Sequence, residues 1–166
     1  MGQLEHEAQT RIITDFAIYT DGLAAVSEKT EWADLFLDDV ISWVKVEFGF
    51  REIETGIRTL YSSGVVVEFE HSPSNLVRQF NKISELISER TVTIANDRKK
   101  MDFARLDFEI DKKTLATQGQ VAVSKFILER RASIQFARER YFSSAPMTTA
   151  NHLQTLADIE QMAASS

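Results

Sequence analysis

Three acidic residues, Asp107, Glu109 and Asp111, alternate with apolar residues and are the clearest candidates for a charged site in this sequence. A period of two places their side chains on one face of a strand, with neighbouring members about 7 Å apart. Such carboxylates could hold a cation or dock a basic partner, but this spacing is too wide for a tight metal site built from these three alone. Alternating charge is more commonly a solvated face, or one that pairs with the next strand. We therefore keep the three acids as candidate binding residues and expect no bound metal.

The three histidines, His6, His71 and His152, do not have the spacing of a metal-binding pair. His71 precedes a predicted helix and His152 lies just inside another, so either could act as a general base if it lined a cleft. Asp39 lies near the apolar face of a third predicted helix, where a buried carboxylate could also line a pocket. Nothing in the sequence places a nucleophile or an acid beside any of them. We favour capping, surface or helix-edge roles for these residues and predict no catalytic residue.

Motifs for the common cofactors and nucleophiles are missing from the sequence. The chain has no cysteine, which excludes a disulfide framework, a thiolate nucleophile, a zinc ribbon and an iron–sulfur site. It contains no phosphate-binding loop, dinucleotide-binding glycine motif, zincin motif, nucleophile elbow or EF-hand loop. A catalytic set assembled from residues far apart in the chain stays open. The sequence thus favours a non-enzymatic protein without a cofactor.

The net charge of −6 argues against non-specific binding to nucleic acid, because duplex phosphates repel an acidic protein. The charge is uneven: residues 1–54 contain twelve acidic and four basic residues, whereas residues 112–142 contain seven basic and two acidic ones. The basic stretch could contact nucleic acid locally, but we favour ion pairs within the same chain. Without a secretory signal or an apolar run of about 20 residues, we expect a soluble, cytoplasmic protein with no membrane partner.

The spacing of apolar residues predicts a single α+β domain over residues 1–166, with a mostly antiparallel sheet and about three amphipathic helices packed on one face. The expected helices cover 31–46, 72–90 and 149–163, and the expected strands cover 11–20, 46–50, 57–61, 65–70 and 103–111. Residues 112–120 are expected to form a loop, and 121–142 a hairpin that turns near residues 131–133, with a helix as the alternative. A hairpin followed by a helix occurs at 57–90 and again at 121–163, which suggests a weak internal duplication.

The first expected helix carries an apolar stripe that includes Trp43 and is predicted to face the core, with Thr30 as its N-cap. After residue 30, the order helix, strands, helix, strands, helix resembles that of type III secretion chaperones. Those proteins are small acidic dimers that bind unfolded stretches of a client. The resemblance, which is one of element order and charge, implies a chaperone-like homodimer.

The last predicted strands carry the residues that we take as candidates for contact with other polypeptides: Phe126, Ile127, Phe136, Tyr141 and Phe142. Apolar residues fall on both faces of this segment, and helices on one face of the sheet would leave the second set exposed. A second copy of the chain is the commonest cover for such a surface. We therefore predict a non-enzymatic protein-binding or assembly protein, chaperone-like or active in virion assembly, that works as a homo-oligomer. The alternative is a small-molecule-binding or enzymatic domain with an aromatic-lined pocket.

Overall fold

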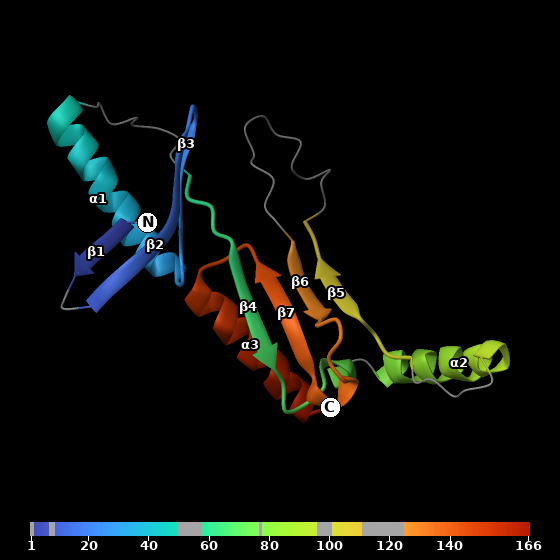
Figure 1. The fold of residues 1–166 in the computed structure, drawn as a ribbon. Coiled ribbons are helices and arrows are strands. Elements are labelled where there is room, and N and C mark those ends of the chain that lie inside the picture. The colour runs from blue at the N-terminus through green and yellow to red at the C-terminus, as the bar shows by residue number, and fades with distance from the viewer. Residues whose placement is uncertain (1, 7–8, 50–57, 77, 96–100, 111–124) are drawn as a thin grey trace. The chain divides into compact units, whose positions relative to one another are not determined.

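The computed structural model describes residues 2–6, 9–49, 58–76, 78–95, 101–110 and 125–166, which Figure 1 draws in colour. It contains three α-helices and antiparallel sheets, so the predicted α+β class is confirmed. The strands form two sheets, one of three strands and one of four, where the sequence predicted one. The predicted loop at 112–120 lies outside the described residues.

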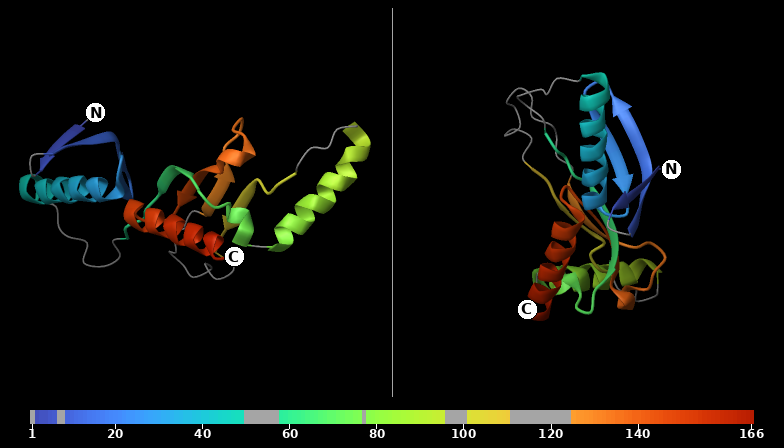
Figure 2. Two further views of the ribbon diagram at one scale, coloured as in Figure 1. Left: turned by 90° about the horizontal axis from the view of Figure 1, so that it is seen from below. Right: turned by 90° about the vertical axis from the view of Figure 1, so that its left-hand side faces the viewer.

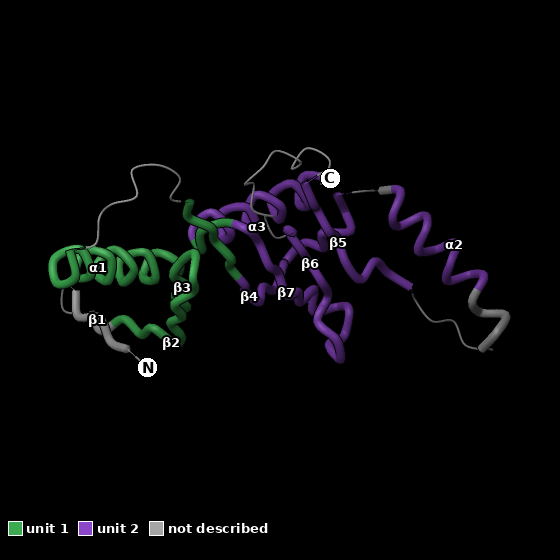
Figure 3. Tube along the Cα trace, turned by 90° about the horizontal axis from the view of Figure 1, so that it is seen from above, with its two compact units in different colours: residues 1–63, 147–149 green, residues 64–146, 150–166 purple. Residues whose placement is uncertain are grey.

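The chain divides into two compact units (Figure 3). Unit 1 comprises residues 1–63 and 147–149, and unit 2 comprises residues 64–146 and 150–166. That these units behave as one domain stays a prediction. Each unit contains its own sheet, so the helices cannot all pack on one face of a common sheet, as the sequence suggested.

Unit 1 contains a three-stranded sheet in the order β1 (Gly2–His6), β2 (Gln9–Tyr19) and β3 (Gly22–Ser27). The β2–β3 hairpin turns at the predicted Asp21-Gly22 position, and its register shifts between Ile13 and Asp15. This bulge inserts one residue, so Ile13 and Phe16, three positions apart, both face the helix that follows. Ile13 is buried there, and the ring of Phe16 meets that of Phe36 edge-on at 5.2 Å.

Helix α1 spans Thr30–Phe48 and packs on β2 and β3. Its N-cap is Lys29 in extended conformation, so the prediction of Thr30 as N-cap is wrong. The strand predicted at 46–50 is also wrong for its described part, because Val46 and Phe48 belong to the last turn of α1. The helix ends at Gly49, whose φ of 61° is the left-handed conformation that glycine adopts without a Cβ penalty.

Unit 2 contains a four-stranded sheet in the order β4 (Ser63–Glu68), β7 (Arg140–Ala145), β6 (Phe126–Arg130) and β5 (Arg105–Phe108). The predicted hairpin in 121–142 is confirmed by the antiparallel β6–β7 pair, and the alternative of a helix there is wrong. Its connection includes a short 3₁₀ helix, Phe136–Arg138. The strand predicted at 57–61 is wrong over 58–61, because these residues have no regular structure. Strand β4 pairs with β7, and not with a strand next to it in the sequence.

Helix α3 (Thr149–Ala164), close to the predicted range, covers one face of this sheet. The core between them is a cluster of buried residues, Phe69, Leu128, Tyr141 and Leu156, ringed by half-buried Val65, Val67, Phe103, Leu106, Phe126 and Ile159. Alternation along the strands supplies one side of this cluster, and the i, i+3 step from Leu156 to Ile159 supplies the other.

Helix α2 (Arg78–Ala95) is preceded by a separate 3₁₀ turn, Pro73–Leu76, where the sequence predicted one helix over 72–90. The turn is tightened by Ser72, whose hydroxyl accepts the amide of Ser74 and whose carbonyl accepts the amide of Asn75. Figure 1 and Figure 2 show α2 running away from the edge strand β5, so it covers neither face of the four-stranded sheet.

Candidate functional site

The five candidate contact residues are not brought together by the structure. The ring of Tyr141 is fully buried in the core, and half-buried Phe126 lies on the same side of the sheet. Phe136 lies in the connection between β6 and β7, where its ring contacts Arg130. Ile127 and Phe142 point to the opposite face of the sheet, on neighbouring strands.

The two acidic candidates that the structure describes form ion pairs with nearby basic residues. Arg105 holds Asp107 at 2.5 Å and Glu129, on the adjacent strand, at 3.3 Å. Glu109 forms an ion pair with Lys125. The hydrogen bond from Arg105 lowers the pKa of Asp107 below its ordinary value. Asp107 is thus paired within its own strand, and a binding role for these acids stays a prediction.

Asp111 lies outside the described residues. Among the residues that are described, no group of three or more histidine or acidic side chains could hold a metal ion.

A buried serine–histidine pair links β7 to α3. Ser143 Oγ and His152 Nε2 are 2.8 Å apart, and both residues are fully buried. Ser143 donates its hydroxyl proton to the carbonyl of Ile127 at 2.9 Å, so its lone pair faces the histidine and Nε2 must carry the shared proton. Burial lowers the pKa of His152, which favours the neutral ring.

This pair does not have the arrangement of a nucleophile and its base. A catalytic serine would donate its proton to the histidine, and both groups would need access to a substrate. Ser143 directs its proton away from the ring, and Phe126 packs edge-on against His152 with the two ring centroids 6.0 Å apart. The pair therefore connects sheet and helix. The prediction of a capping or surface histidine at 152 is wrong, whereas His71 and Asp39 are exposed, as favoured.

A second buried polar group, Arg130, was missed as a core residue. Its guanidinium donates to Glu139 Oε2 at 3.2 Å and to the Phe136 carbonyl at 3.0 Å, and Asp102 lies at 3.6 Å. The rings of Phe136 and Tyr141 flank it at 4.7 and 4.8 Å. Glu139 also accepts the hydroxyl of Tyr141 at 2.8 Å, and burial raises the pKa of that tyrosine. One residue of the basic stretch is thus used inside the fold.

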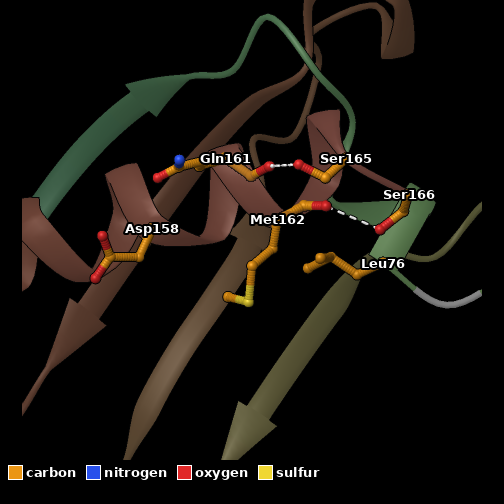
Figure 4. A pocket seen from close by; sticks show the side chains of 6 residues that line it. All are labelled: Leu76, Asp158, Gln161, Met162, Ser165 and Ser166. Carbon is orange, nitrogen blue, oxygen red and sulfur yellow. Dashed lines mark hydrogen bonds between the residues drawn. The ribbon is translucent and has the colours of Figure 1, made fainter.

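The two best-formed pockets in the described part of unit 2 are open, and neither is lined by a histidine. The larger, of about 640 Å³, lies at the end of α3 (Figure 4) and is lined by Leu76, Asp158, Gln161, Met162, Ser165 and Ser166. The hydroxyls of Ser165 and Ser166 donate back to carbonyls of the same helix. The smaller, of about 140 Å³, lies between α2 and residues 101–103. His71, His152 and Asp39 do not line either one.

Three strongly exposed large side chains of unit 1 lie at the end of α1, on a surface we call the α1 patch: Trp43, Val46 and Phe48. Their exposed fractions are 57%, 80% and 70%, and the rings of Trp43 and Phe48 contact each other at 5.4 Å. The prediction that Trp43 faces the core is therefore wrong. Among the side chains of unit 1 that the structure describes, only Ile13 and Ala33 are buried apolar groups.

Comparison with known proteins gives no relative: no family model, curated protein or solved structure matches the chain. None of the helices in the described ranges is long and apolar enough to cross a membrane.

Proposed function

We propose that the protein works by binding other polypeptides, first of all copies of itself, and not by catalysis. The single observation that carries this proposal is the α1 patch. A tryptophan, a valine and a phenylalanine, each more than half exposed, stand together on a unit that buries two apolar side chains in its described part. Contiguous exposed apolar surface of this kind usually marks an interface.

Unit 1 has a physical reason to need a cover. A single helix on a three-stranded sheet can shield one face of that sheet, and small units bury too little apolar surface to be stable alone. Each apolar side chain that a partner covers adds about 1.5–3 kcal/mol. A second copy brings the same apolar surface and is the commonest partner.

The described polar groups support a non-catalytic role. The buried histidine is hydrogen-bonded to a serine that directs its proton elsewhere, and the carboxylates of Asp107 and Glu109 are paired with Arg105 and Lys125. Two forms of this proposal are a chaperone-like dimer, in line with the resemblance of element order, and an assembly protein of a virion. A cytoplasmic location accords with the lack of cysteine.

Sedimentation velocity over about two decades of protein concentration, from about 1 to about 100 µM, tests the proposal, because self-association follows mass action. We expect oligomers whose fraction grows with concentration, and a shift towards monomer in Trp43→Ser. Met162→Ser, which changes a side chain of similar exposure on α3, is the matched control and should sediment like the wild type. A wild-type chain that stays monomeric throughout would contradict the proposal.

A further inference from the structure

Two acidic residues flank the tryptophan of the α1 patch. Asp39 lies four residues before Trp43 and Glu47 four residues after it, so each acid is one helical turn from the ring on the same side of α1. Both acids are exposed. Neither carboxylate has an ion pair or a hydrogen bond within the described part of the chain. The α1 patch is therefore an apolar surface with an acidic rim.

This acidic rim opposes the pairing of one α1 patch with another. A second α1 placed antiparallel about a two-fold axis at Trp43 would bring Asp39 of each copy to Glu47 of the other. A parallel pair would bring Asp39 to Asp39 and Glu47 to Glu47. Carboxylates face carboxylates in both directions, and like charges brought together across an interface disfavour the contact. The rim thus selects a basic surface as the partner of the patch.

The connection between β6 and β7 carries such a surface, which we call the arginine loop: Arg131, Phe136, Arg138 and Arg140. The ring of Phe136 is 41% exposed and supplies an apolar centre. Arg131 and Arg138 are exposed, and Arg140 is half-buried. Among the residues that the structure describes, none of the three guanidinium groups has an ion pair or a hydrogen-bond partner. The arginine loop therefore has the composition of the α1 patch with the opposite charge.

Two of these arginines stand opposite each other. The amide of Arg131 donates to the carbonyl of Arg140 at 3.0 Å, where the ladder between β6 and β7 ends. Like charges directly opposite each other destabilise a strand pair. Arg105 and Arg130, on the same sheet, are each held by carboxylates of their own chain. A carboxylate from a second molecule would relieve the repulsion that remains at the arginine loop.

We propose that the α1 patch of one copy docks on the arginine loop of a second copy, with Trp43 against Phe136 and the two acids against the arginines. The inference rests on the proposed function, because it names the surface that covers the α1 patch. Charge complementarity selects this occupant, since each of the two surfaces repels a second copy of itself and attracts the other. The two surfaces differ, so the contact is heterologous and builds rings or open chains of copies.

A charge swap tests the docking by sedimentation velocity of the full chain. The α1 variant is Asp39→Lys/Glu47→Lys, and the loop variant is Arg131→Glu/Arg138→Glu. Each variant alone should self-associate about tenfold more weakly than the wild type, because ion pairs are replaced by repulsive contacts. An equal mixture of the two should associate like the wild type, since every contact then joins opposite charges. Recovery in the mixture also shows that both variants are folded.

The matched control is Glu85→Lys/Glu89→Lys, which makes the same change of charge at two exposed positions of α2 and should associate normally. Variants that associate normally, or a mixture that does not recover, would overturn the inference and leave the proposed function intact. A monomeric wild type would remove both. Binding of a single-stranded oligonucleotide at physiological salt that the loop variant loses would assign the arginine loop to nucleic acid and also overturn the inference.

Discussion

Ser143 and His152 share a hydrogen bond of 2.8 Å in the core of unit 2, and the serine proton is directed to the Ile127 carbonyl and not to the ring. The bond joins the sheet to α3 through two polar groups that burial would otherwise leave unsatisfied. Such a group costs about 1–3 kcal/mol when its partner is removed. The histidine is thus a part of the core whose charge state affects the stability of the fold.

The free energy of unfolding should therefore decrease as the pH is lowered through the range in which histidine titrates. Burial holds the pKa of native His152 below its ordinary value of 6.5, so the unfolded chain binds this proton first as pH falls. The contribution of the neutral ring is fully present above pH 6.5 and is lost below it. Urea unfolding at neutral and mildly acidic pH measures this dependence.

The matched variant is His152→Gln, which keeps a donor for Ser143 but does not titrate. Its free energy of unfolding should change less between the two pH values than that of the wild type. Equal changes in both proteins would show that His152 does not contribute to the pH dependence.

Arg130→Met should destabilise the fold by about 3–5 kcal/mol, because it leaves the carboxylates of Glu139 and Asp102 without their buried cation. Arg131→Met, at the exposed neighbouring position, should stay within about 0.5 kcal/mol of the wild type. Chemical denaturation at neutral pH measures both. Similar losses for the two variants would mean that the ring and ion-pair contacts of Arg130 add nothing.

Trp43→Asp should leave the free energy of unfolding of the monomer within about 1 kcal/mol of the wild type, because more than half of this side chain is exposed. The same change should reduce self-association, since a charge would have to be buried at the α1 patch. Leu128→Ala, in the core of unit 2, is the contrast and should cost about 2–5 kcal/mol. Thermal unfolding at low concentration measures the two stabilities, and sedimentation velocity measures the self-association. Loss of the fold in Trp43→Asp would place that residue in the core after all.

Gly49→Ala should cost about 1 kcal/mol, although nothing lies within 4 Å of the position that its Cβ would occupy. The cost arises from the backbone, because φ of 61° suits glycine better than alanine. Gly22→Ala offers the control: its surroundings are equally open and its φ is not in the left-handed region. Circular dichroism during denaturation should separate the two variants, and equal stability would contradict the backbone explanation.

Elements with a regular apolar period were predictable from the sequence. The strand near 11–20, the first helix, the β6–β7 hairpin and α3 all have one period over most of their length. The end of α1 was misassigned because Val46 and Phe48 alternate like a strand, while the helix continues to Gly49. Both side chains are exposed in the helix, so their apolar alternation does not report a buried strand face.

The buried polar residues could have been found in part. Arg130 follows Phe126 and Leu128 at steps of two, which places it on the core face of β6, and Ser143 alternates with Tyr141 in the same way on β7. His152 precedes Leu156 by one helical turn. What period alone cannot supply is the partner: Arg130 is held by Glu139 from the next connection and by Asp102 from before β5. The exposure of the α1 patch could not be predicted either, because the same apolar spacing occurs on a helix face that is buried in a core and on one that is exposed at an interface.

Thr30, at the start of α1, has its hydrogen-bond partner 119 residues later in the chain. Its amide donates to the hydroxyl of Thr149, and the amide of Thr149 donates to the hydroxyl of Thr30. Because synthesis proceeds from the N-terminus, the start of α1 is made long before residue 149, and its amide has only water or local partners until then. Unit 1 therefore completes this corner only after nearly all of unit 2 has been synthesised.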